Sequence, residues 1–437
     1  MSHADWDRLT YYSQKVKIFS FIDTDEPQVH PSTYLRIAQL QSSALFPTLR
    51  HVHYTLRNKP ISNAHIFFFL SPLLDSISLD NIEGFENSVV GPFLAGLSES
   101  AQMLSRIVLR NGEMSVDTVK TSIVHFKQLR SLELSDAVFM TDFALWEVLG
   151  TLPSLTNLTL AIKPNQHPSE SHDSAHPENS NGRSGDSKYF YALENLCVKG
   201  SCFLIHHLLS SIDSPCLKSI EVYPEIDFHE KLVPEDLFAP LTIVTSKWSH
   251  SLNKLVIGAC RWSNGNANPY AISKFLMLFT VLHEIQTFRL MGLRMGLGNM
   301  NDDVGRLVKS WPKLRILRLP FTEPFMISLS TLMIIAENCP KLRRLTIGLD
   351  ISTIPPFDTS RRSPCNKLED FSVGSLKARS SDTTTQTKLG YQIQVAQHLD
   401  FIFPYLKSAQ MLPKDEIWLA ILDLLRLCKN ARRVKQE

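Results

Sequence analysis

Apolar residues recur along this chain in the spacing L-x-x-L-x-L, in which the later apolar positions alternate with polar ones. Four clear copies are FKQLRSLEL, LPSLTNLTL, WPKLRILRL and CPKLRRLTI, which begin their pattern at Leu129, Leu155, Leu314 and Leu342. Strict alternation of this kind is typical of a half-buried strand. Each copy therefore predicts a short strand with its apolar residues in the core and its third and fifth positions pointing outward.

The copies follow one another at a nearly constant interval. Many neighbours lie 24–28 residues apart, within the roughly 20–29 residues of a leucine-rich repeat. Longer gaps, such as 155–193 and 368–406, leave room for extra loop or a longer helix. The first positions are Leu49, Leu74, Leu104, Leu129, Leu155, Leu193, Leu217, Leu252, Ile285, Leu314, Leu342, Leu368 and Leu406.

Between the predicted strands the apolar spacing changes to three or four residues. VDTVKTSIVHF, DFALWEVLGTL and SLSTLMIIAENC all show it, and it is typical of a helix with one buried face. Alternating strands and helices favour right-handed parallel units. The sequence therefore predicts an α/β leucine-rich-repeat solenoid, a curved horseshoe with parallel strands on the concave face and helices on the convex face.

The ends and interruptions of the repeat predict the domain organisation. Residues 1–22 would form an N-terminal cap, with Asp5 as a helix N-cap, followed by a first strand around Phe19 and Phe21. Residues 23–411 would form the solenoid. Within it, 163–188 contains no large apolar residue and is predicted to be disordered, and 376–388 is predicted to be a flexible loop. Residues 412–437 would form a C-terminal capping helix.

Composition narrows the classes of partner and compartment. The chain has 45 Lys plus Arg and 43 Asp plus Glu, so its net charge of +2 gives no reason to expect nucleic acid or a membrane as the partner. The N-terminal residues are polar, and the apolar runs fall far short of the roughly 20 residues that span a bilayer. Seven scattered cysteines favour a reducing compartment, the cytoplasm or the nucleus.

Motifs of catalysis or cofactor binding are not found in the sequence. It has no glycine-rich phosphate loop and no G-x-S-x-G element, so we expect neither enzymatic activity nor a cofactor. His51 and His53 share one face of a predicted strand, but a metal site would need a further ligand; two exposed histidines are the alternative. Cys197 and Cys202 have no matching second pair, which favours packing over zinc.

Two segments resemble a known family. ENCPKLRRLTIG, with Cys339, Pro340 and Leu342, resembles the cysteine-containing leucine-rich repeats of F-box proteins. DWDRLTYYSQKVKIFSF resembles the segment that joins the F-box to the repeats in many fungal F-box proteins. The resemblance implies substrate recognition in an SCF-type E3 ubiquitin ligase complex.

The F-box itself, which binds the Skp1 adaptor, is not expected in this chain because only residues 1–15 precede the first strand. Skp1 is therefore expected as a partner only if the gene model lacks that module. The alternative is a leucine-rich-repeat scaffold or regulator outside the ubiquitin system.

Outward positions of the predicted strands indicate where a partner would bind. In the first half they include Val108 and Glu133, and in the second half Val256. Successive repeats of the second half also supply one cation each: Lys254, Arg289, Arg318 and Arg344. Arginine suits paired contacts with carboxylates and phosphates. We predict that this stripe contacts an acidic or phosphorylated segment of a protein partner on the concave face; solvated charge, paired with nearby Asp or Glu, is the alternative.

Overall fold

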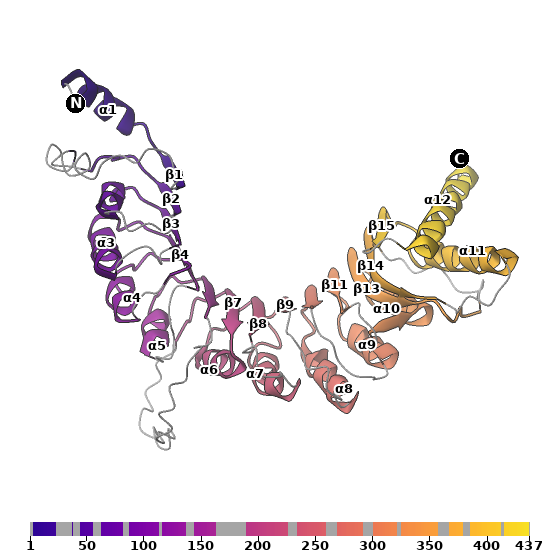
Figure 1. Cartoon of the computed structure of the whole chain (residues 1–437). Helices are drawn as coiled ribbons and strands as arrows, with labels where there is room; N and C mark the ends of the chain where they lie inside the picture. Colours follow the sequence, from indigo (N-terminus) through magenta and orange to yellow (C-terminus); the bar gives the residue numbers. More distant parts are fainter. Residues whose placement is uncertain are drawn as a thin grey trace, which may run out of the picture. The chain divides into compact units, whose positions relative to one another are not determined.

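The computed structural model of the chain forms two compact units, Met1–Leu217 (unit 1) and Lys218–Glu437 (unit 2) (Figure 1). The structure describes residues 3–22, 37, 44–55, 63–81, 87–112, 116–136, 144–162, 189–225, 234–258, 269–291, 300–320, 325–356, 367–378, 385–411 and 415–436.

Strands of unit 1 pair in chain order, and each described pair is parallel. Their alternation between half-buried and buried residues, as in Ser131–Ser135, is the predicted one. The strands are β1 (Ile18–Ile22), β2 (His51–Thr55), β3 (Ser76–Asp80), β4 (Arg106–Arg110), β5 (Ser131–Ser135), β6 (Asn157–Ala161) and β7 (Asn195–Gly200).

Strands of unit 2 continue the same pattern, again with parallel pairs among the described residues. They are β8 (Ser219–Pro224), β9 (Lys254–Ile257), β10 (Thr287–Leu290), β11 (Ile316–Arg318), β13 (Arg344–Asp350), β14 (Asp370–Lys377) and β15 (Ser408–Met411). An additional short strand, β12 (Met326–Ser328), pairs with the end of β13.

Helices alternate with the strands and lie on one side of them in each unit (Figure 1). Unit 1 contains α1 (His3–Ser13), the 3-10 helix η1 (Asn63–Phe69), α3 (Asn87–Ser100), α4 (Val116–Ile123), α5 (Ala144–Gly150) and α6 (Cys202–Ser211). Unit 2 contains α7 (Pro234–Lys247), α8 (Pro269–Met277), η3 (Leu278–Val281), α9 (Met300–Lys309), α10 (Leu329–Asn338), α11 (Thr385–Ile402) and α12 (Glu416–Gln436).

The leucine pattern explains why the repeats stack. Every predicted first position, from Leu49 to Leu406, is buried. Within each unit, the residue after a first position hydrogen-bonds to its equivalent in the preceding repeat: Thr156 N–H donates to Arg130 C=O (2.9 Å) in unit 1, and Arg343 N–H donates to Arg315 C=O (2.8 Å) in unit 2. Buried leucines and this repeated hydrogen bond fix the stacking distance, and the predicted α/β leucine-rich-repeat solenoid is confirmed.

Local sequence also sets where helices begin. Ser328 precedes α10, and its hydroxyl accepts a hydrogen bond from the N–H of Thr331 (3.3 Å). Asp415 does the same for Trp418 at the start of α12 (3.0 Å). Such side chains satisfy N–H groups that have no partner within the helix. Asp5, in contrast, lies in the first turn of α1, which begins at His3, so the prediction that Asp5 is the N-cap is wrong.

The last helix packs on the end of the unit 2 sheet. Trp418 is fully buried, with its ring 5.9 Å from that of Phe371 on β14. Arg432 donates to Pro404 C=O (3.4 Å) and forms an ion pair with Asp400, and Lys429 donates to Leu406 C=O. These cations therefore connect α12 to the last turn of α11 and to the segment that follows it.

The sequence predicts two segments without regular structure, 163–188 and 376–388. The predicted disordered insert 163–188 lies outside the described residues. The predicted flexible loop 376–388 is too long, because β14 extends to Lys377 and α11 begins at Thr385. Parallel pairing of Leu376 and Lys377 with the end of β13 orders the first part. Buried residues of α11, among them Val395 and Leu399, hold the helix that starts in the second part.

Strand β12 was not predicted, because it is too short to show the repeat pattern. It pairs with β13 where the register of β13 and β14 shifts at Gly348. A Cβ atom at Gly348 would lie 2.9 Å from both Met326 Sδ and Phe325 O, so glycine is what lets β12 approach.

None of the described helices is both long enough and apolar enough to cross a membrane.

Candidate partner-binding surface

The outward residues of the strands form one face in each unit. In β3, β5 and β6 the first, third and fifth residues are half-buried and those between them are buried, as the sequence predicts. Val108 and Val256 are exceptions, since each is only 2% exposed. These two residues were predicted to be available to a partner, and that prediction is wrong.

Neighbouring strands explain the burial of the two valines. Val108 lies between Ser78 and Glu133 in the register, and Val256 lies between Glu221 and Arg289. Long charged side chains cover apolar neighbours with their aliphatic stems while their charged ends stay in water. A valine on an open strand face thus supports the charged residues beside it.

The four predicted cations of unit 2 occupy consecutive positions in the sheet, on β9, β10, β11 and β13. They form two rows. Lys254 and Arg344 lie in the row that also contains Thr287 and Ile316. Arg289 and Arg318 lie in the next row, where they are direct register partners.

Both cations of the first row have a carboxylate beside them. Lys254 Nζ is 2.5 Å from Glu221 Oε1 on β8, and Arg344 Nε is 3.3 Å from Asp370 Oδ2 on β14. This is the arrangement expected of solvated strand charges paired with nearby acids. Exposed pairs of this kind contribute little to stability, typically 0–1 kcal/mol.

Glu221 is held in place from two sides. Burial acts to raise the pKa of its carboxyl group, but hydrogen bonds from Lys254 and Tyr223 outweigh this effect, and the pKa is lowered below 4.5. Tyr223 donates its hydroxyl to Glu221 Oε2 at 2.8 Å. The Tyr223 ring lies over Gly258, where any Cβ atom would be 1.9 Å from it. Gly258 therefore makes room for the tyrosine that orients Glu221.

Arg289 and Arg318 have a different environment. Their direct register neighbours are Val256 on one side and Thr346 on the other, both uncharged, although the charge of Glu221, one strand beyond Val256, also acts on Arg289. Arg318 Nε is buried and has no hydrogen-bond partner among the described residues. Two adjacent guanidinium groups repel each other, and a buried donor without an acceptor costs free energy. An anion between the two arginines would reduce their repulsion.

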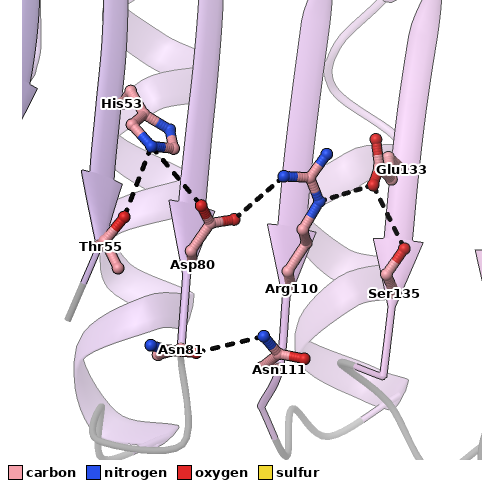
Figure 2. Close-up of polar contacts among 8 residues, drawn as sticks. All are labelled: His53, Thr55, Asp80, Asn81, Arg110, Asn111, Glu133 and Ser135. Atoms are coloured by element: carbon pink, nitrogen blue, oxygen red, sulfur yellow. Dashed lines mark hydrogen bonds and ion pairs between the residues drawn. The ribbon is translucent and has the colours of Figure 1, made fainter. Parts of the chain in front are cut away.

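Unit 1 carries a polar network that the sequence analysis did not find (Figure 2). Arg110 on β4 lies between two carboxylates: its Nε is 2.6 Å from Glu133 Oε1 on β5, and its Nη1 is 3.5 Å from Asp80 Oδ1 on β3. Ser135 also donates to Glu133 Oε1 (3.3 Å). The hydrogen bond to Glu133 raises the pKa of the Arg110 guanidinium, although burial alone would lower it.

Asparagines extend the ordered polar row beyond the strands. Asn111 Nδ2 donates to Asn81 Oδ1 at 3.1 Å (Figure 2), and both residues have positive φ, 52° and 59°. Asn tolerates this left-handed conformation better than most residues. Successive repeats thus leave their strands in the same way, which aligns the side chains of this row.

Of the two histidines of β2, His53 joins this network. His53 Nε2 is 3.6 Å from Asp80 Oδ2 and 3.4 Å from Thr55 Oγ1. In the part of the chain that the structure describes, no group of three His, Cys, Asp or Glu residues could hold a metal ion.

The cysteines with a described position are not in disulfides. Cys339, the residue of the family-like repeat, is fully buried, and its Sγ lies 3.7 Å from Val308 O and from Trp311 O. Burial raises the pKa of this thiol to about 12. Cys339 is therefore a packing residue that joins α10 to the preceding repeat.

No protein-family model matches the sequence, and no curated protein matches it. Among solved structures, the leucine-rich repeat-containing protein LegL7 from Legionella pneumophila is similar, at 12% identity and a TM-score of 0.38, over 85% of this chain and 97% of that chain.

A protein from Bacteroides fragilis is similar at 13% identity and a TM-score of 0.32, over 62% of this chain and 64% of that chain. The match thus spans less than two thirds of that protein. Both scores are low, so the description of the fold rests on the strands and helices of this chain itself.

Proposed function

We propose that this chain is a protein-binding repeat protein and that the outward strand face of unit 2 binds an acidic or phosphorylated segment of its partner. The observation that supports this proposal is the pair Arg289 and Arg318, side by side in the register with uncharged direct neighbours on both flanks. A carboxylate or phosphate accepts paired hydrogen bonds from guanidinium groups. Lys254 and Arg344, on the strands that flank the pair, would extend the contact along the segment by exchanging their present partners Glu221 and Asp370 for its acidic groups.

The cellular role that we propose is substrate recognition for an SCF-type E3 ubiquitin ligase, in the cytoplasm or the nucleus. Support comes from the resemblance of the repeat at Cys339, Pro340 and Leu342 to those of F-box proteins. The alternative is a non-catalytic scaffold or regulator outside the ubiquitin system. Both roles use the same surface, and they differ in which complex the chain joins.

An array of acidic, phosphorylated and neutral peptides tests the binding surface. Full-length protein should retain acidic or phosphorylated peptides, more weakly as salt is raised, and Arg289→Glu/Arg318→Glu should lose them. Arg106→Glu/Arg130→Glu is the matched control, since both residues are exposed in unit 1 and carry the same charge. Equal retention by the two double variants would contradict the proposed surface.

Co-purification separates the two cellular roles. If the chain serves a ubiquitin ligase, the product of the complete coding sequence should recover Skp1 from cells, in amounts that Arg289→Glu/Arg318→Glu leaves unchanged. Recovery of the peptide-defined partner without Skp1 would favour the scaffold. A substitution in the proposed substrate surface should reduce only the recovery of the partner, so recovery of the partner and recovery of Skp1 are independent measurements.

A further inference from the structure

The sequence of the first strand of unit 1 contains none of the residues that usually protect the edge of a sheet. β1 has only β2 as a strand neighbour among the described residues. Its outward residues Ile18 and Ile22 are 69% and 54% exposed. Edge strands are normally protected by charges, proline or a bulge, and the sequence of β1, IFSFI, contains neither a charged residue nor a proline.

Backbone groups of β1 point alternately toward β2 and away from it. Lys17 C=O points toward β2, because it accepts hydrogen bonds from Arg50 N–H (2.8 Å) and His51 N–H (3.1 Å). Since the direction alternates with each residue, the groups of Phe19 also face β2, whereas those of Ile18, Ser20 and Ile22 point away from it. The N–H and C=O groups on the outer edge of β1 are thus centred on Ser20.

The sequence of this strand is the same in both directions. In an antiparallel pair of two copies related by a two-fold axis at Ser20, Ile18 of each copy lies opposite Ile22 of the other. Phe19 lies opposite Phe21 in the same way. The hydrogen-bonded positions of this pair are those of Ile18, Ser20 and Ile22, the residues whose backbone groups point outward.

The side chains of such a pair also match. Ile18 and Ile22 would cover each other on the outward face, where opposed apolar side chains stabilise a sheet. On the opposite face, the half-buried Phe19 and Phe21 stack within one copy (centroids 6.3 Å) and would gain an aromatic neighbour from the second.

The charges that flank the strand in the sequence are opposite on its two sides. Lys15 and Lys17 precede the strand, and Asp23 and Asp25 follow it. When this sequence is aligned with its own reverse about Ser20, the two lysines match the two aspartates. The charge pattern of the sequence therefore favours an antiparallel second copy over a parallel one.

We propose that β1 is a homodimerisation strand: a second copy of this chain pairs antiparallel with it about Ser20 and joins the two unit 1 sheets edge to edge. This interface is separate from the arginine surface of unit 2, and it does not depend on the proposed partner.

A pair of double variants tests this geometry in the full chain. Ile18→Lys/Ile22→Lys places like charges opposite each other and should weaken dimerisation at least tenfold. Ile18→Lys/Ile22→Glu changes the same residues but places opposite charges together, and it should restore the dimer. Sedimentation equilibrium over a range of concentrations measures both, and circular dichroism verifies that each variant is folded. Met103→Lys, at another exposed apolar position of unit 1, is the control.

Cross-linking gives an independent readout. Across the two-fold axis the Ser20 Cα atoms would be about 5.5 Å apart, within the roughly 4.4–6.8 Å that a disulfide spans. Ser20→Cys should therefore give a covalent dimer on mild oxidation, and Ser78→Cys, in the interior strand β3, should not. A wild-type chain that stays monomeric, a dimer that survives Ile18→Lys/Ile22→Lys, or loss of the dimer in both double variants would overturn the proposal.

Discussion

The strand faces of the two units share one backbone template but differ in how their charges are arranged. In unit 1, Arg110 lies between Asp80 and Glu133, so its charge is compensated within the face. In unit 2, Arg289 lies next to Arg318, with uncharged residues on both flanks. The repeat fixes where the outward residues lie. The identity of these residues decides whether the charges of a strand face compensate one another, as in unit 1, or leave adjacent cations that suit an anion, as in unit 2.

Both units have a core of buried leucines, and substitutions in this core should have the largest effect on stability. Leu132→Ala on β5 and Leu317→Ala on β11 each remove a buried leucine that is 1% exposed. Each should lower the stability of its unit by about 3 kcal/mol. Hydrogen-exchange mass spectrometry of peptides from β5 and β11 measures the stability of each unit separately. A loss in one unit only would show that the two cores are not equivalent.

Giving unit 2 the charge pattern of unit 1 should produce the next largest effect. Thr346→Glu places a carboxylate beside Arg318, its register partner. Capture of an acidic or phosphorylated peptide should fall about tenfold, which corresponds to about 1.4 kcal/mol. Fluorescence anisotropy measures the affinity, and Thr346→Gln is the uncharged control. If Thr346→Glu and Thr346→Gln bind equally well, the arginine pair is not the binding site.

Removing a cation should act differently on stability in the two units. Arg110→Met leaves Asp80 and Glu133 without their shared cation and should cost about 1 kcal/mol, a modest value because Arg110 is partly exposed. Arg318→Met removes a repulsion and a buried donor without a partner, so stability should be unchanged or higher. Thermal unfolding of both variants tests the difference in sign; equal losses would contradict the contrast between the two faces.

Acid titration should give the smallest effect. The pKa of Glu221 is lowered in the folded chain, so its ion pair stabilises above the ordinary pKa of 4.5 and is lost as the pH falls through the folded pKa. Lys254→Met should therefore cost about 0.5 kcal/mol near pH 7 and progressively less below the ordinary pKa. Urea denaturation at several pH values measures this cost. In a Glu221→Gln background, Lys254→Met should show no such pH dependence.

Much of the fold was predictable because it depends on local periodicity. Each strand predicted from an anchoring leucine, such as β5 after Leu129 and β11 after Leu314, begins two residues after that anchor. The helices of residues 116–123 and 329–338 also follow from apolar spacing. β12 was missed because three residues are too few to show a period.

The candidate surface was predictable only in part. The positions of Lys254, Arg289, Arg318 and Arg344 followed from strand alternation, but their division into two rows depends on the register between strands. Asp80 and Arg110 were missed because only two outward positions of each pattern were considered. They occupy the next outward position, so extending the alternation by two residues would have found them.

The sequence by itself determined the repeating unit, because apolar period and turn chemistry act within a few residues along the chain. Tertiary structure decided which charges meet. Arg110 and Glu133 are 23 positions apart and Arg110 and Asp80 are 30 apart, yet pairing of adjacent strands brings them together. The burial of Val108 and Val256 has the same origin, since neighbouring strands supply the side chains beside them. Interactions across strands depend on stacking and register, which no local pattern contains.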